Sequence, residues 1–183
     1  SGRCLLADVE TGEEIATSVL EYRHRVMSET LPDGTRLGVD WHLQHPGDYL
    51  DVLRITIRDV IKQAEIRPEQ VIGIGIDTTG CTILPIKKDG TPLCFLERWK
   101  GSPNAYVKLW KHHAAQPYAD KMTETALARN EKFIQRYGGK ISSEWMFPKI
   151  WQVLDESPEI YEDTDAFLEV TDSVSYTHLR AHE

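Results

Sequence analysis

A polar turn that follows an apolar run has the residue types best suited to bind a small molecule. Residues 71–77 (VIGIGID) are β-branched and apolar apart from two glycines and the final Asp77. The next five residues, 78–82, supply three threonine hydroxyls, Gly80 and one cysteine. Because α/β sheets bind ligands beyond the ends of their strands, this turn is a candidate binding site. Asp77 could act there as a catalytic carboxylate or, equally, as an acceptor for backbone hydrogen bonds of the turn.

A second group of polar and aromatic residues lies at 105–115, where the sequence predicts a helix. Trp110 could offer a sugar an apolar face and one indole N–H donor, although a helical tryptophan can also belong to the core. Lys111 is a weaker candidate, since a lysine is by default exposed to solvent. His112 and His113 would point about 100° apart on a helix, so they cannot readily share one metal ion and are expected on the helix surface.

Periodicity predicts the elements that must hold these residues in place. The 71–77 run, apolar on both faces, is typical of a strand buried inside a sheet, and Asp89-Gly90 predicts a hairpin turn beyond it. We expect one mixed sheet with strands at 4–10, 14–22, 71–77, 82–87 and 92–97, covered by a helix at 49–64. Further helices are expected at 118–130, 142–158 and 159–164. This order of strands and helices predicts an α/β fold.

The composition excludes several classes of function. The chain has 183 residues, of which 21 are lysine or arginine and 29 are aspartate or glutamate, so its formal net charge is -8. This acidic balance argues against electrostatic binding to nucleic acid or to an anionic membrane. The three cysteines have no metal-binding or disulfide spacing, which predicts free thiols in a reducing compartment. No apolar run approaches the ~20 residues of a membrane span and no leader pattern occurs, so we expect a soluble cytoplasmic protein.

Four separated segments resemble one family of enzymes. They are 1–3 (SGR), 73–82 (GIGIDTTGCT), 107–116 (VKLWKHHAAQ) and 136–145 (RYGGKISSEW). Lys149, Trp151 and the pair Pro158-Glu159 match a broader pattern of the same family. Through these segments the chain resembles, over residues 1–172, the carbohydrate kinases that include glycerol kinase, xylulokinase and ribulokinase. The resemblance is greatest to the ribulokinase branch.

The resemblance implies an ATP-dependent kinase that phosphorylates the 5-hydroxyl of L-ribulose in L-arabinose catabolism, with ATP and Mg²⁺. It implies a mixed sheet of the ribonuclease H-like, actin-related fold, in which residues 1–172 form part of the first of two domains. In the family the first phosphate-contacting turn precedes the segment matched by 1–3. The general base and the nucleotide-binding domain come after residue 172. We therefore expect further chain upstream, no catalytic residue within this chain and no turnover by the chain alone; a homodimer is also open.

The resemblance also assigns roles to individual residues. It places Gly80 and Trp110 beside the sugar, with Asp77 and Lys111 as further substrate-binding candidates and Ser1, Gly2 and Arg3 near the phosphates. It implies no metal ligand. Gly138-Gly139-Lys140 lacks the spacing of a phosphate-binding loop and is expected to be a tight turn. Residues 173–183 have neither the aromatic residue nor the helix that the family has there, so we expect a non-native, adapter-like tail; a divergent natural end is the alternative.

Two other classes of function remain open at this point. A nuclease on a ribonuclease H-like fold would gather carboxylates around two metal ions, and Asp8, Asp77 and Asp172 have the required residue type. A non-catalytic binding module of the actin-like kind would need no such cluster. Salt-dependent DNA binding would support the first, and self-association without ligand the second.

Overall fold

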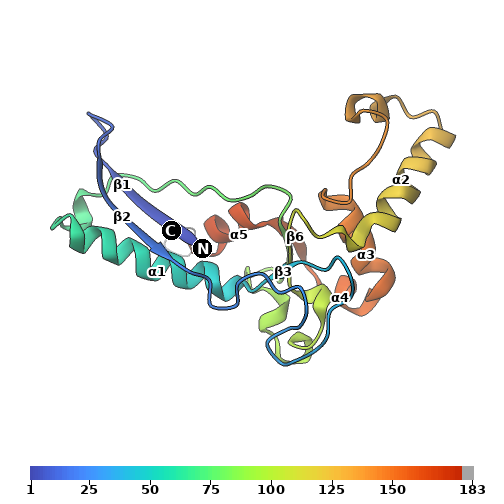
Figure 1. The fold of residues 1–183 in the computed structure, drawn as a ribbon, viewed down its shortest axis with the longest axis horizontal. Coiled ribbons are helices and arrows are strands. Elements are labelled where there is room, and N and C mark those ends of the chain that lie inside the picture. The colour runs from blue at the N-terminus through green and yellow to red at the C-terminus, as the bar shows by residue number, and fades with distance from the viewer. Residues whose placement is uncertain (179–183) are drawn as a thin grey trace. The chain divides into compact units, whose positions relative to one another are not determined.

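A computed structural model describes residues 1–178 of the chain (Figure 1). The described chain forms two compact units. The first contains Ser1–Arg25 and His45–Asp77, and the second contains Val26–Gln44 and the chain from Thr78 onward. Among the described residues, no helix has both the length and the apolar character needed to cross a membrane.

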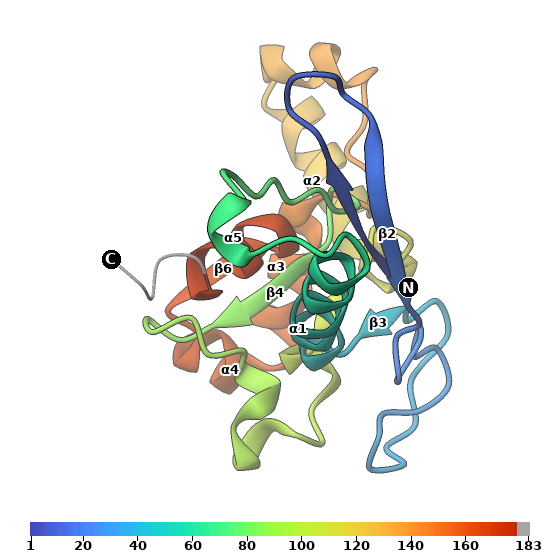
Figure 2. The same ribbon diagram turned by 90° about the vertical axis from the view of Figure 1, so that its left-hand side faces the viewer.

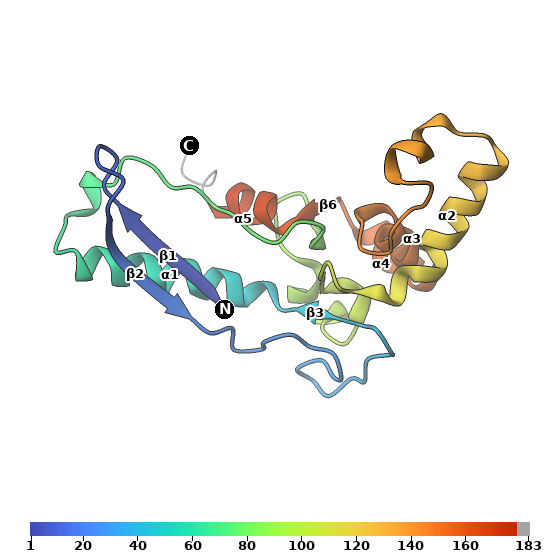
Figure 3. The same ribbon diagram turned by 45° about the horizontal axis from the view of Figure 1, so that its top comes forward.

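The first unit is a two-stranded antiparallel sheet packed against one helix. Strand β1 (Gly2–Ala7) pairs with β2 (Glu14–Leu20), and helix α1 (Pro46–Gln63) lies along both strands (Figure 3). The turn between the strands is closed by Asp8, whose Oδ1 accepts from two backbone N–H groups at 2.9 Å. The sequence predicted all three elements, with ends that differ from the observed ones by up to three residues.

Residues 71–77 are not the buried central strand that the sequence predicted. After the 3-10 helix η1 (Pro68–Gln70), the chain is extended but pairs with no strand of the described part, as the green trace beyond α1 shows in Figure 1. Ile72 is 79% exposed and Ile74 is 52% exposed. A β-branched run favours an extended backbone, but burial on both faces also requires neighbouring strands and covering helices, which the described residues do not supply.

The second unit contains a four-stranded sheet with the order β3-β5-β4-β6. Figure 2 shows β3, β4 and β6. Its strands are β3 (Leu43–Gln44), β4 (Ile83–Ile86), β5 (Val107–Lys108) and β6 (Ala166–Glu169). All neighbouring pairs are antiparallel, and every residue of β4 is buried. The expected single mixed sheet is therefore wrong, because the structure has two separate antiparallel sheets.

The helices of the second unit largely confirm those predicted from the sequence. They are α2 (Gln116–Ala128), α3 (Met146–Glu156), α4 (Pro158–Asp163) and α5 (Val170–His178). Helix α2 packs against α3, and the 3-10 helix η6 (Lys132–Tyr137) follows α2 (Figure 3). The turn after η6 has left-handed backbone at Gly138 and Gly139, as expected for a tight turn.

Two further predicted elements are absent. The stretch 105–115 is not a helix: it contains the end of η4 (Pro103–Ala105), strand β5, a turn and η5 (His113–Ala115). The strand expected at 92–97 is replaced by the short helices η2 (Leu93–Phe95) and η3 (Glu97–Trp99). The Asp89-Gly90 turn does form, but the hairpin ends at one bridge between Ile86 and Pro92, since proline has no N–H for a ladder.

The C-terminal prediction is partly corrected. Residues 173–178 belong to α5, so this part of the expected non-native tail is helical. Residues 179–183 lie outside the described residues. Whether the tail is native stays a prediction.

The core of the second unit gathers residues from the sheet, the 3-10 segments and the helices. Its buried members are Met27, Leu31, Leu43, Leu93, Cys94, Ala105, Tyr106, Val153 and Ile160. Because Val153 of α3 and Ile160 of α4 belong to this core, both helices pack against the segments at 93–94 and 105–106 and against β3. This packing positions the candidate site.

Candidate functional site

The turn around Gly80 is open to solvent. Gly80 is exposed, and a Cβ added to it would meet no atom within 4 Å. Cys81 has left-handed backbone, with φ of 58°, a conformation that is uncommon for residues other than glycine. The turn therefore presents backbone rather than side chains to an approaching molecule at Gly80.

Hydrogen bonds to the segment at 169–171 fix the flanks of this turn. The backbone N–H of Thr82 donates to Oε2 of Glu169 at 2.9 Å, and the Thr82 carbonyl accepts from the N–H of Val170 at 2.9 Å. The hydroxyls of Thr78 and Thr171 lie 2.5 Å apart. The turn is thus held by the end of β6 and the start of α5.

Trp110 and Lys111 lie in a turn that follows β5. The Leu109 N–H donates to the His42 carbonyl at 3.0 Å, and the Leu109 carbonyl accepts from the N–H of His112 at 3.0 Å. Trp110 is 43% exposed, so it is not a core tryptophan, and Lys111 is half-buried. The exposed indole is therefore available to a ligand.

Lys149 joins the two turns. Its Nζ donates to the carbonyl oxygen of Cys81 at 2.5 Å and to that of Leu109 at 2.8 Å. The side chain comes from α3 and is 0% exposed. The structure thus brings the neighbour of Gly80 and the neighbour of Trp110 to one buried ammonium group.

Burial governs the electrostatics at this junction. It lowers the pKa of Lys149 to about 8, an effect that Cys81, Glu169 and Glu144 partly oppose. It also raises the pKa of the Cys81 thiol, with Glu169 acting in the same direction. Cys81 is therefore a neutral thiol and not an activated nucleophile.

A second buried lysine anchors a polar network beneath the Trp110 turn. Nζ of Lys108 donates to Oδ1 of Asn104 at 2.7 Å and to Oε1 of Gln152 at 3.0 Å. His112 accepts from the His42 N–H through Nδ1, at 3.2 Å, so its Nε2 carries the proton and donates to Gln152 Oε1 at 2.8 Å. His112 is 0% exposed, which corrects the expected place on a helix surface.

Burial disfavours the charged form of Lys108 in this network. Burial lowers the pKa of Lys108 to about 7, with Glu156 opposing and Lys149 reinforcing the shift. The ammonium also lies 4.2 Å from the ring centre of Trp41, a cation–π contact. Burial is the main cause that holds the pKa of His112 far below its usual range, and the charge of Lys108 is the second. The ring is therefore neutral.

The remaining predicted site residues belong to the first unit. Ser1, Gly2 and Arg3 lie at the start of β1, where Ser1 and Arg3 are exposed. Asp77 is exposed at the end of the extended segment. Arg3 is the one cation among the three residues assigned to the phosphates, so they do not by themselves make a nucleotide site.

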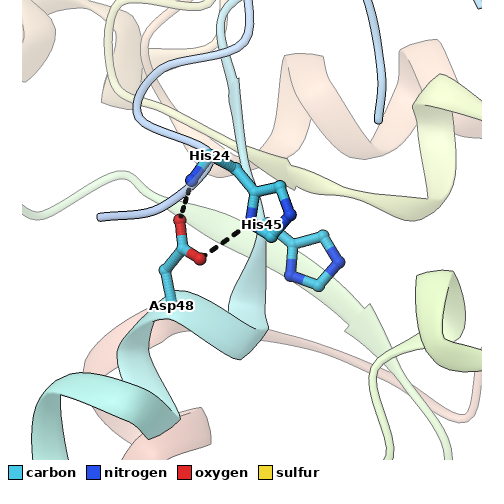
Figure 4. Close-up of side chains that lie close together, drawn as sticks. All are labelled: His24, His45 and Asp48. Atoms are coloured by element: carbon cyan, nitrogen blue, oxygen red, sulfur yellow. Dashed lines mark hydrogen bonds and ion pairs between the residues drawn. The ribbon is translucent and has the colours of Figure 1, made fainter. Parts of the chain in front are cut away.

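The first unit also contains a cluster with metal-ligand residue types. One ligand atom from each of His24, His45 and Asp48 lies within 4.8 Å of the others (Figure 4). The two imidazole rings are stacked, with centres 4.3 Å apart and planes 24° apart, so their lone pairs lie in separate, nearly parallel planes and cannot both point at one ion about 2 Å from each nitrogen. Nδ1 of His24 contacts Asp48 at 2.7 Å, and Nδ1 of His45 accepts from the N–H of Gly47 as an N-cap of α1. The cluster is a helix cap, and its nitrogen-rich set does not suit Mg²⁺.

The described part of the chain contains no two-metal carboxylate site. Among the described residues, the His24 cluster is the one metal-like group, and it contains none of Asp8, Asp77 and Asp172. The three cysteines are free, as the spacing predicted. The geometry therefore gives no support to the nuclease alternative.

Comparison with known proteins decides the family relationship. No family model matches the chain. It is 55% identical over 175 residues to a ribulokinase of Shouchella clausii, and 52% identical over 177 residues to a ribulokinase of Bacillus licheniformis. These alignments cover 95% and 96% of this chain. The chain is a relative of the ribulokinases.

The chain spans about a third of the length of these ribulokinases, 31% of the first and 32% of the second. A solved structure titled as a xyloylose kinase from Brucella ovis superposes on it with a TM-score of 0.71 at 15% identity, covering 94% of this chain and 30% of the other. The fold is therefore that of a segment of a sugar kinase structure, with mixed α/β composition.

An apolar cavity of about 500 Å³ lies between α2 and α3. Aromatic side chains of Phe133, Tyr137, Trp145 and Trp151 are among its lining residues. None of the site residues predicted from the ribulokinase resemblance lines it.

The roles of Lys149, Lys108 and Gln152 are not predicted by the sequence patterns described above. A signal was present in α3, where Lys149 and Gln152 occupy helical positions next to the buried Pro148 and Val153. A lysine and a glutamine at core-facing positions predict buried hydrogen bonds, because neither side chain can be buried without partners. Their partners lie up to 68 residues away in sequence, so spacing alone could not name them.

Proposed function

We propose that this chain forms the sugar-facing part of an ATP-dependent ribulokinase, which transfers the γ-phosphoryl group of ATP to the 5-hydroxyl of L-ribulose in L-arabinose catabolism. The observation that carries the proposal is 50–55% identity to ribulokinases over about 95% of the chain. Residues 1–172 would belong to the first domain, with the ribonuclease H-like fold, and residues 173–183 would include the non-native tail.

In this proposal the sugar lies against the turns of Gly80 and Trp110. Gly80 leaves room for the sugar to approach the backbone, since no atom lies within 4 Å of the place of a Cβ. The half-exposed indole of Trp110 supplies an apolar face for C–H groups and one N–H donor. Asp77 and Lys111 are further candidates for hydrogen bonds to the hydroxyl groups.

The phosphoryl donor would be held mainly by residues outside this chain. Ser1, Gly2 and Arg3 would lie near the phosphates, and the exposed guanidinium of Arg3 suits a phosphate contact. MgATP would supply the phosphoryl group and charge neutralisation. We assign no general base to this chain, and the chain alone should not turn over.

A segment exchange tests the proposal directly. Residues 1–172 replace the matching part of the Bacillus licheniformis ribulokinase, and ADP release is measured with MgATP and each of L-ribulose, D-ribulose and D-xylulose. We expect turnover with a preference for L-ribulose, and no turnover by the 183-residue chain alone. A folded exchange protein that prefers another ketose, or that releases no ADP with L-ribulose, would contradict the proposed substrate.

A further inference from the structure

We infer that Lys149 is a positioning residue for the sugar site: it sets the spacing between the Gly80 turn and the Trp110 turn without touching the sugar. The inference rests on the proposed function, because it concerns the same pocket. What it adds is a residue whose effect on sugar binding would be indirect and selective.

The geometry separates Lys149 from any ligand. The side chain is 0% exposed, and its Nζ contacts two backbone carbonyls, those of Cys81 and Leu109. A sugar at the exposed faces of Gly80 and Trp110 would therefore meet the two turns, and Lys149 would lie behind them.

Both contacts constrain backbone at the site. Cys81 has a left-handed conformation with φ of 58°, which is costly for a residue with a Cβ, and a charged donor to its carbonyl offsets that cost. The Leu109 carbonyl accepts from both Lys149 and the N–H of His112, so the turn that presents Trp110 is closed from two directions. Movement of Lys149 would shift both turns at once.

Lys108 provides a matched control. It is also a fully buried lysine of the second unit, 1% exposed, but its Nζ bonds to the side chains of Asn104 and Gln152 and not to the carbonyls of the two turns. Lys108→Met and Lys149→Met each remove one buried ammonium and leave an unbranched side chain that is one heavy atom shorter. Any difference in sugar binding then reports the carbonyl contacts and not the loss of a buried charge.

The experiment measures KM for L-ribulose and for MgATP in the full-length kinase that carries this segment. We expect Lys149→Met to raise KM for L-ribulose by about tenfold to hundredfold, because small misplacement of binding groups has effects of that size. KM for MgATP should stay within about twofold. Lys149→Arg keeps a cation with several N–H donors and should recover part of the loss. Lys108→Met keeps both carbonyl contacts of Lys149 and should raise KM for L-ribulose clearly less than Lys149→Met does.

Hydrogen exchange of the same variants is a readout that does not need activity. Lys149→Met should speed amide exchange in both turns, 80–82 and 109–112, more than Lys108→Met does. If Lys149→Met does not fold, Lys149→Arg replaces it. The inference would be overturned if KM for L-ribulose were unchanged and amide exchange were no faster in either turn. A wild-type enzyme without ribulose-dependent ADP release would instead overturn the proposed function, while the exchange result would still test the positioning role. Equal rises in both KM values would show that Lys149 is merely structural.

Discussion

Nδ1 of His24 lies 2.7 Å from Oδ1 of Asp48, and the backbone N–H of the same histidine donates to Oδ2 at 3.0 Å (Figure 4). Asp48 is in the first turn of α1 and is 3% exposed. A buried carboxylate needs such partners, so this pair ties residue 24 to the start of the helix.

We expect His24→Ala to lower the free energy of unfolding by about 1–3 kcal/mol, because one buried oxygen loses its ring donor. His24→Asn should lose less, since its side-chain amide can donate to the same oxygen. Chemical denaturation followed by circular dichroism measures both variants. Equal losses would show that the ring packs against His45 without a useful hydrogen bond.

Gly2 allows β1 to approach α1 closely. A Cβ at this position would lie 2.4 Å and 2.8 Å from the two Cγ atoms of Val52. We therefore expect Gly2→Ala to reduce the free energy of unfolding by about 1–3 kcal/mol through overpacking. Gly73→Ala is the control, since its Cβ would meet no atom within 4 Å. A stable Gly2→Ala variant in thermal unfolding would mean that the strand can move away from the helix at little cost.

The elements that the sequence predicted well are those defined by local patterns. Near-alternation in β1 and β2 and the 3.6-residue spacing in α1 can be seen in the sequence, and the contacts that bury these apolar residues lie within one small unit. The prediction of a helix at 105–115 was wrong because the burial of this stretch depends on distant partners: Lys108 bonds to Gln152, 44 residues away. No local pattern distinguishes a lysine of that kind from one on a helix surface.

In the candidate site, too, the sequence predicted local features but not the contacts between distant residues. The motif at 73–82 and Trp110 predicted two parts of the site, and the structure joins these two exposed turns through Lys149. The prediction of a strand at 71–77 described the extended backbone correctly but not its surroundings, since pairing is a property of the neighbours and not of the run itself.

The unpaired 71–77 segment should make the chain prone to self-association. It combines high β-propensity, low charge and no proline, and Ile72 and Ile74 are exposed. We expect Ile74→Lys to reduce self-association in light scattering while it changes the free energy of unfolding by less than about 0.5 kcal/mol. Val39→Lys alters an 87% exposed residue outside the run and should have no such effect. Equal effects of the two variants would point to net charge as the cause.

Stability should depend on pH through Lys108. Burial lowers its pKa to about 7, from 10.5 as the ordinary value that applies to the unfolded chain. Between these values the unfolded chain binds more protons than the folded chain, so the free energy of unfolding rises with pH, by up to about 1.4 kcal/mol per pH unit. Below pH 7 both states are protonated and the cost of burying the charge is fully present.

Lys108→Met should remove this dependence. We expect the difference in the free energy of unfolding between wild type and variant to change in favour of wild type from pH 7 to pH 9, measured by urea denaturation. Lys149 keeps its own smaller contribution above its pKa of about 8 in both proteins, so it cancels in the difference. A difference that is constant over this range would mean that Lys108 keeps its proton in the folded chain.

Trp110 offers the sharpest test of the proposed sugar site, because its exposure separates binding from stability. At 43% exposed, the indole contributes less to the core than a buried tryptophan would, so Trp110→Ala should change the melting temperature little. In a ribulokinase into which this segment has been exchanged, Trp110→Ala should raise KM for L-ribulose roughly 5–150-fold, which corresponds to about 1–3 kcal/mol, since the sugar loses an apolar face and an N–H donor. Trp110→Phe keeps an aromatic face without the N–H donor, so its KM for L-ribulose should lie between those of wild type and Trp110→Ala. KM for MgATP is the internal control: an equal rise for both substrates, or a large loss of stability, would show that Trp110 supports the fold and does not contact the sugar.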